Sequence, residues 1–128
     1  MPTRATGTFE IKLTSQPPDD AGLGRMSIEK QFHGDIEAAS KGQMLAAGTT
    51  VKGSAGYVAL ERVAGTIHGR TGDFVLQHPA TMNRGEPQIS VTVVPDSGTG
   101  ELAGLSGKME INIAEGQHSY HFDYTLPE

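Results

Sequence analysis

Two titratable side chains share a strand face with apolar residues and are the first candidates for chemistry. Glu61 is in phase with Ala59 and Val63, and His78 is in phase with Leu76. Successive side chains of a strand point to opposite faces, so both groups are expected to point toward an apolar interior. A perturbed carboxyl or imidazole in a cavity is suited to act as a general acid, a general base or a ligand-orienting donor.

Each candidate also has a structural interpretation. Glu61 could form an ion pair with Arg70 or Lys30, because burying a carboxylate is costly unless a cation or several donors satisfy it. His78 could be a satisfied core histidine. Lys30 and Ser40 are in phase with apolar residues too. We expect Lys30 at the rim with its stem along apolar surface, and the Ser40 hydroxyl bonded to backbone.

Three more residues are candidates for ligand binding. Tyr57, His118 and Tyr120 lie in phase with apolar positions and complete a set that includes Glu61 and His78. The alternatives are a rim histidine without function and tyrosines that fill the core with their hydroxyls at its edge.

The predicted turn between two strands tests whether Glu61 and His78 could touch. With Thr71 and Gly72 at the turn centre, His78 lies opposite Gly65, four residues along the strand from Glu61. At about 3.3 Å per residue the two side chains are then roughly 13 Å apart. A direct acid–base dyad is not expected, and the pair would mark two ends of one elongated cavity.

Alternation of apolar and polar residues predicts the elements that carry these side chains. The eight expected strands fall near residues 8–13, 26–32, 36–47, 54–68, 74–78, 89–93, 109–113 and 120–126. The fourth segment also fits helical spacing, but its glycines and β-branched residues favour a strand. Turns are expected at 34–35 and 70–73, and a single helical turn within 101–105.

The last two strands permit a register check. A two-residue turn at Glu115-Gly116 places Ile113 opposite His118, Ile111 opposite Tyr120 and Met109 opposite Phe122. All eight expected strands together predict an all-β fold in one domain spanning 1–128. This fold is either a sandwich or a closed eight-stranded antiparallel barrel. Closure is favoured because it removes exposed strand edges.

Composition excludes several classes of function. The chain has 128 residues, no cysteine and a net charge of −5. Without cysteine there is no disulfide, thiol catalysis or iron–sulfur cluster, and no motif predicts a metal site or a cofactor. The acidic balance makes nucleic acid and anionic membranes unlikely partners. The N-terminal residues lack the apolar segment of a signal peptide, so a cytoplasmic location is expected.

Three segments carry a family resemblance: KQFHGD at 30–35, GSAGYVALERVAGTIHGRTGDFVLQH at 53–78, and VVPDSGTGELAGLSG at 93–107. Together they resemble a family of small bacterial proteins of unknown function with a barrel similar to the plant allene oxide cyclases. The resemblance implies an eight-stranded antiparallel barrel of this calycin-like kind, and a homo-oligomer. It implies no established reaction, and no cyclase active site maps onto this chain.

Three hypotheses for function follow. The first is a barrel that binds a small, largely apolar ligand, oriented by Glu61, His78 and Tyr57. The second is an isomerase, cyclase or hydrolase with Glu61 or His78 as general acid or base. The third is a filled barrel that acts through an oligomer surface. An open interior of roughly 300 Å³ or more favours the first two. A lumen filled by large side chains favours the third. The side chains expected to fill it are Phe9, Phe32, Phe74 and Phe122.

Overall fold

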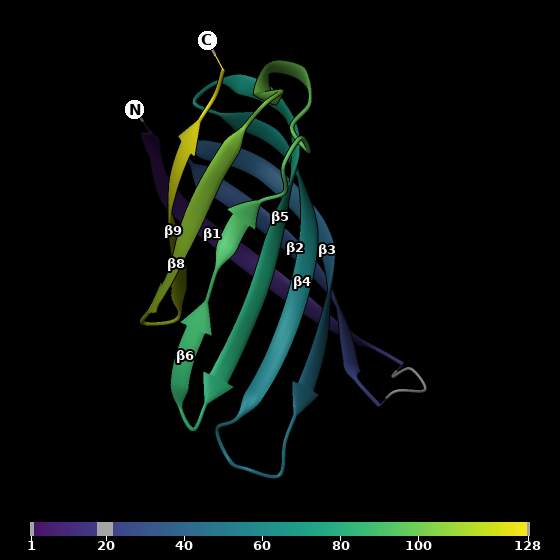
Figure 1. Ribbon diagram of the computed structural model, residues 1–128. Helices are drawn as coiled ribbons and strands as arrows, with labels where there is room; N and C mark the ends of the chain where they lie inside the picture. Colours follow the sequence, from purple (N-terminus) through teal and green to yellow (C-terminus); the bar gives the residue numbers. More distant parts are fainter. Residues whose placement is uncertain (1, 18–21, 128) are drawn as a thin grey trace.

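The protein is built almost entirely of antiparallel strands (Figure 1). The computed structural model describes residues 2–17 and 22–127. In these residues the elements are, in order, β1 (Thr3–Gln16), β2 (Gly24–Gly34), β3 (Ile36–Gly48), β4 (Ala55–Ile67), β5 (Arg70–Asn83), β6 (Glu86–Ile89), β7 (Val91–Val93), the 3-10 helix η1 (Gly100–Leu102), β8 (Ser106–Ala114) and β9 (Gln117–Thr125).

The strands form a closed barrel. The hydrogen-bonded order is β4-β3-β2-β1-β9-β8-β7-β5-β6, and an additional pairing of β4 with β5 closes the ring. Both β6 and β7 pair with β5, one after the other, on either side of Ser90. The nine strands therefore make a closed eight-stranded antiparallel barrel with one extra short strand, which confirms the predicted fold.

The C-terminal hairpin has the predicted register. Its turn residues, Glu115 and Gly116, have φ angles of 53° and 79°, as a tight two-residue hairpin turn requires. Met109 pairs with Phe122, and Ile111 with Tyr120. Residues 55–67 form a strand and not a helix, and one turn of 3-10 helix lies at 100–102, close to the predicted site.

The β4–β5 hairpin differs from the prediction. Its turn is His68-Gly69, with φ angles of 47° and 79°, and Ile67 pairs with Arg70. The predicted turn at 70–73 is therefore wrong, because these residues already belong to β5. The left-handed conformation of His68 is supported from outside the hairpin, by a hydrogen bond to the Tyr124 hydroxyl.

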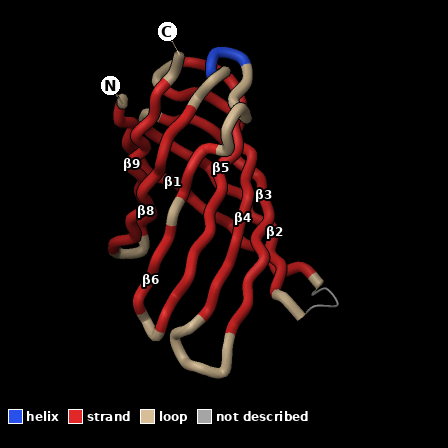
Figure 2. The backbone as a smooth tube through the Cα atoms, in the orientation of Figure 1, coloured by secondary structure: helices blue, strands red, loops and turns tan. Residues whose placement is uncertain are grey.

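One end of the barrel is filled. All four phenylalanines are at most 4% exposed, and two of them, Phe74 and Phe122, stack with centroids 6.0 Å apart. The segment containing η1 covers this end (Figure 2) and inserts Leu102 and Leu105, which are 0% and 2% exposed. The four phenylalanines are thus buried, as expected.

At the opposite end the inward-facing apolar side chains are less buried. Several apolar side chains there follow the inward phase of their strands yet remain accessible: Leu13, Met82, Ile89 and Ile113 are 48%, 42%, 47% and 63% exposed. Tyr57, Met26 and Met44 are half-buried in the same phase. Inward-pointing apolar side chains at this end therefore keep contact with solvent. We call these seven residues the mouth.

Candidate functional site

Four polar side chains meet inside the barrel between its filled end and the mouth. They are buried, with exposures of 7%, 3%, 1% and 4%, and we call them the polar cluster: Lys30, Ser40, Glu61 and His78. Lys30 Nζ donates a hydrogen bond of 2.7 Å to Glu61 Oε2, and Ser40 Oγ donates one of 2.9 Å to Oε1. Both oxygens of the carboxylate are thus satisfied by donors, one from β2 and one from β3.

His78 also contacts the carboxylate. Its Nε2 lies 2.6 Å from Glu61 Oε2, although the N–H direction falls outside the range of a hydrogen bond. The contact is therefore mainly electrostatic, and it requires the proton on Nε2. The predicted separation of roughly 13 Å is wrong because the true turn pairs His78 with Ala59, two residues from Glu61 on the same face.

The charges of the cluster fix the ionisation of Glu61. Burial by itself would raise the pKa of this carboxyl, but the contacts with His78 and Lys30 outweigh burial and lower the pKa to about 2. Glu61 is therefore a carboxylate at neutral pH. The predicted alternative of an ion pair between Glu61 and Lys30 is confirmed, whereas the prediction that Lys30 lies at the rim is wrong.

Aromatic rings complete the surroundings of the Lys30 ammonium. Nζ lies 5.0 Å from the ring centroid of Phe9 and 5.8 Å from that of Phe32. The negative faces of such rings stabilise a cation when water is absent. Lys30 is thus held between a carboxylate and two rings, which explains how an ammonium group remains buried here.

Four consecutive strands of the barrel, β2 to β5, each supply one member of the cluster. Cross-strand pairing aligns Lys30 with Ser40 and Gly42 with Glu61. The glycine is necessary at this point. A Cβ atom at Gly42 would lie 2.1 Å from the Leu60 carbonyl oxygen and 2.6 Å from Glu61 Cα. Gly42 therefore lets β3 approach β4 closely behind the Glu61 side chain.

The remaining predicted site residues lie in different places. Tyr57 is half-buried in the mouth, and burial raises the pKa of its hydroxyl. His118 is opposite Ile113 near the same end, with its ring 5.1 Å from that of Phe9. Tyr120 is 1% exposed, and its hydroxyl accepts a hydrogen bond from the Ile36 amide and donates to the His33 carbonyl. Tyr120 therefore belongs to the filled core.

Sequence reasoning did not include Lys30 and Ser40 among the site residues. The signal was present, because both lie in phase with apolar neighbours along their strands. Their spacing gives no indication of the shared partner, since Glu61 lies on a third strand.

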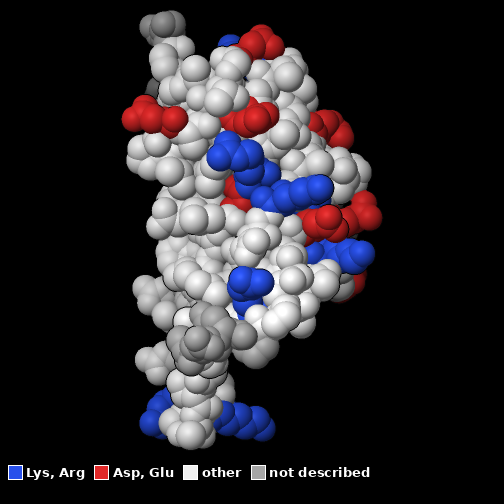
Figure 3. Space-filling view, turned by 90° about the vertical axis from the view of Figure 1, so that its right-hand side faces the viewer, with Lys and Arg blue, Asp and Glu red and all other residues white. Residues whose placement is uncertain are grey.

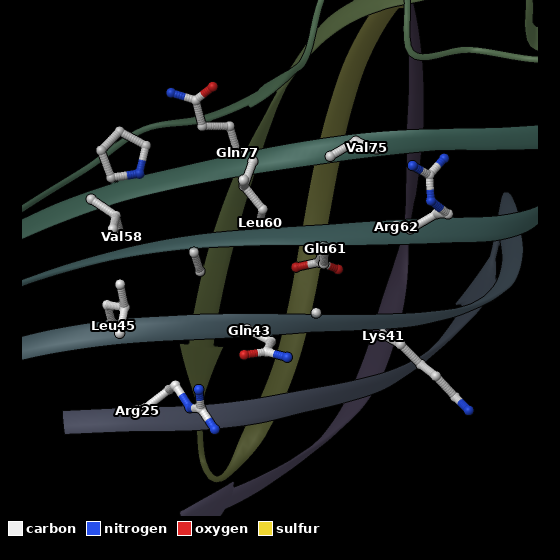
Figure 4. A pocket seen from close by; sticks show the side chains of 13 residues that line it. Arg25, Lys41, Gln43, Leu45, Val58, Leu60, Glu61, Arg62, Val75 and Gln77 are labelled. Carbon is white, nitrogen blue, oxygen red and sulfur yellow. The ribbon is translucent and has the colours of Figure 1, made fainter. Parts of the chain in front are cut away.

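A groove lies on the outside of the barrel. The face in Figure 3 carries Lys and Arg across its middle. A groove of about 890 Å³ runs over the outer surface of β2–β5, lined by Arg25, Lys41, Gly42, Gln43, Leu45, Val58, Ala59, Leu60, Glu61, Arg62, Val75, Gln77 and Pro79. In Figure 4, Lys41 and Arg62 lie at one end, and Leu45 and Val58 at the other. The Glu61 side chain is 0% exposed, so it borders this outer groove only from beneath.

The described residues contain no group of three or more His, Cys, Asp or Glu arranged to hold a metal ion. Among these residues, no helix has the length and hydropathy needed to cross a membrane.

Comparison with known proteins identifies the family. A model described as "Protein of unknown function (DUF3224)" matches residues 5–124. The chain belongs to the DUF3224 family. A crystal structure of a DUF3224 protein of unknown function from Shewanella oneidensis MR-1 is 47% identical and covers 100% of both chains with a TM-score of 0.95. No curated protein matches.

These matches confirm the expected resemblance to a bacterial family of unknown function. Membership of the DUF3224 family indicates a barrel fold for this chain and does not indicate an activity. The likeness to allene oxide cyclases stays a prediction, so a function has to be argued from the site.

Proposed function

We propose that this DUF3224 protein binds one small, largely apolar molecule in the mouth of the barrel, with the polar group of the ligand directed toward His78. The observation that carries the proposal is the exposure of four large apolar side chains that follow the inward phase of their strands, Leu13, Met82, Ile89 and Ile113. Small-molecule sites are concave and mostly apolar, with a few placed polar groups, and they occur in the mouths of β-barrels.

Burial of this apolar surface would drive binding. Fully covering a large aliphatic side chain is worth about 1.5–3 kcal/mol, so covering the exposed halves of four gives on the order of 3–6 kcal/mol. The mouth is apolar and the polar cluster lies deeper in the interior. An amphiphile would therefore enter with its polar group first and leave its apolar part among the mouth residues.

Catalysis on the same barrel is the alternative, with Glu61 or His78 as general acid or base. The contact of 2.6 Å between His78 Nε2 and Glu61 Oε2 favours it. The pKa of about 2 for Glu61 opposes a role as base, because effective catalytic groups titrate near the working pH. Glu61 would then only position His78, and His78 would be the group that exchanges a proton.

The direct experiment is native mass spectrometry of the protein after incubation with an extract of its own host. The expected result is a reproducible added mass of a few hundred daltons, lost on denaturation. An extract component recovered unchanged supports binding, and one recovered chemically altered supports catalysis.

Two tryptophan variants locate the ligand. Ala80 is inward in phase, between Tyr57 and Ile89, so Ala80→Trp fills the mouth and should abolish the added mass. Thr81→Trp places the same ring on the outward face of β5 and should leave the added mass unchanged. Absence of any added mass in several extracts, or its persistence in Ala80→Trp, would overturn the proposal.

A second candidate function is association of copies through the outer groove. Val58 and Leu60 are 56% and 54% exposed there. The flanking Arg25, Lys41 and Arg62 form no ion pair among the described residues, although the chain has a net charge of −5. A second copy of this acidic chain is thus the complementary occupant. Leu60→Lys should shift an oligomer to monomer in sedimentation velocity. A monomer in the unaltered protein would reject this candidate.

A further inference from the structure

The two ring nitrogens of His78 differ in their surroundings. Nε2 is buried against Glu61, whereas no described residue forms a hydrogen bond with Nδ1. Nδ1 also keeps some solvent-accessible surface. The His78 side chain is 5% exposed and lies in the inward phase of β5. Nδ1 is thus a polar atom on the inward face of β5 for which the described residues supply no hydrogen-bond partner.

The contact with Glu61 decides what Nδ1 can do. A proton on Nε2 is required beside the carboxylate, and a neutral imidazole carries its single proton on one nitrogen. Lys30 already balances the charge of Glu61 at 2.7 Å, so a second cation is not needed for neutrality. In the neutral ring Nδ1 bears a lone pair and accepts a hydrogen bond.

The charge of the cluster restricts the ligand further. At a pH where the His78 ring is neutral, and with Lys30 and Glu61 paired, the four members carry no net charge. A carboxylate ligand would bring an unpaired negative charge next to Glu61, and an ammonium ligand would bring a positive charge next to Lys30. Burial of an unpaired charge is much more costly than burial of a hydroxyl that has a hydrogen-bond partner.

We infer that the ligand class is an uncharged apolar alcohol whose hydroxyl donates a hydrogen bond to His78 Nδ1. This inference rests on the proposed function and specifies the chemistry of the same site. Met82 at the rim lies four positions along β5 from His78, a distance of roughly 13 Å at about 3.3 Å per residue. A medium-length alkyl or terpenoid chain spans the mouth from hydroxyl to rim.

Three probes of matched chain length test the inference by isothermal titration calorimetry at mildly alkaline pH: decanol, decanoate and decyl methyl ether. Decanol should bind most tightly. The ether keeps the oxygen but has no proton to donate, so it should bind roughly fivefold more weakly, the value of one ordinary hydrogen bond. Decanoate should bind at least tenfold more weakly because its charge has no partner.

Variants assign the preference to a residue. His78→Leu removes the acceptor and should make decanol and the ether bind equally, while both still bind through their chains. His121→Leu removes an exposed histidine on the outward face of β9 and should preserve the preference for decanol. Because His78→Leu could fail to fold, the comparison of the three probes on the unaltered protein decides the question without it.

The outcomes separate the two claims. If decanol and the ether bind equally, or decanoate binds most tightly, the alcohol inference is overturned while the binding proposal stands. If no probe binds and Ala80→Trp changes nothing in the host-extract experiment, the binding proposal itself fails.

Discussion

Glu61 is a carboxylate in a place where a carboxylate alone would be strongly disfavoured. Its side chain is fully buried, and its oxygens are held by Lys30, Ser40 and His78. Removing one partner of a buried ion pair leaves the other charge uncompensated. The contribution of each member therefore depends on the presence of the others, and single substitutions overstate the value of the pair.

Glu61→Gln should lower the free energy of unfolding by about 3–5 kcal/mol, because Lys30 keeps its charge and loses its counterion. The measurement is urea denaturation followed by circular dichroism. Glu29→Gln, an exposed glutamate on β2, should change stability by less than about 0.5 kcal/mol. A loss below 1 kcal/mol for Glu61→Gln would contradict the picture of a buried, mutually dependent pair.

The double variant Lys30→Met/Glu61→Leu removes both charges together. It should recover most of the stability that Glu61→Gln loses, since apolar replacements of buried pairs are often neutral or stabilising.

Stability should also depend on pH through Glu61. Its pKa falls from 4.5 in the unfolded chain to about 2 in the fold, so the folded state holds the carboxylate more strongly. A lowered pKa gives stability that is complete above 4.5 and is lost as the pH falls toward 2. The shift corresponds to about 3 kcal/mol. Denaturation midpoints measured between these values should fall steeply for the native protein and less for Lys30→Met/Glu61→Leu. Parallel curves would contradict the assignment.

At the scale of elements, the pairing of β3 with β4 depends on where its glycines lie. Gly42 permits close approach beside Glu61, whereas a Cβ atom at Gly48, in the same strand pair, would meet nothing within 4 Å.

Gly42→Ala should therefore destabilise the protein by about 1–3 kcal/mol, as overpacking does, and weaken decanol binding by displacing the polar cluster. Gly48→Ala should change neither property. Thermal unfolding and calorimetry of the two variants check both statements. Equal effects of the two alanines would show that strand propensity, and not space at Gly42, controls this pair.

The β4–β5 hairpin shows where sequence reasoning reaches its limit. Both strands were predicted, but Arg70-Thr71-Gly72 has the composition of a turn, and His68 is a less obvious residue for positive φ. The true turn is supported by the hydrogen bond of His68 to Tyr124 of β9. It is also supported by the proximity of His68 Nε2 to the Asp35 carboxylate, at 3.5 Å, in the β2–β3 connection. Contacts so distant in sequence leave no local pattern. This shift of register separated Glu61 from His78 in the prediction and unites them in the structure.

At the scale of the whole molecule, the barrel has one half whose inward side chains are buried and one half whose inward side chains are partly exposed. Alternation predicted the strands and closure, and the phenylalanines were expected to lie inside. The division into halves was not predictable, because it depends on the register in which strands of unequal length pair along the barrel. Leu13 and Phe9 share a phase on β1 but are 48% and 4% exposed.

The two halves should differ in local stability. Amides around Phe74 and Phe122 should exchange only on global unfolding, whereas amides near Met82 and Ile113 should exchange by local opening. Hydrogen exchange followed by NMR measures this difference. Addition of decanol should slow exchange near Met82 and Ile113 and leave the filled half unchanged. Uniform protection along β5 would contradict the division of the barrel.

The polar cluster also bears on how the chain finds its strand alignment. Each of four successive strands contributes one polar group. A shift of any one strand by one residue would turn its polar group outward and leave the partner group buried without a counterpart. A fully apolar interior would impose a smaller penalty on such misalignment. The cluster thus favours one strand register over its alternatives. We expect a variant with an all-apolar interior to gain stability and to fold to a mixture of registers.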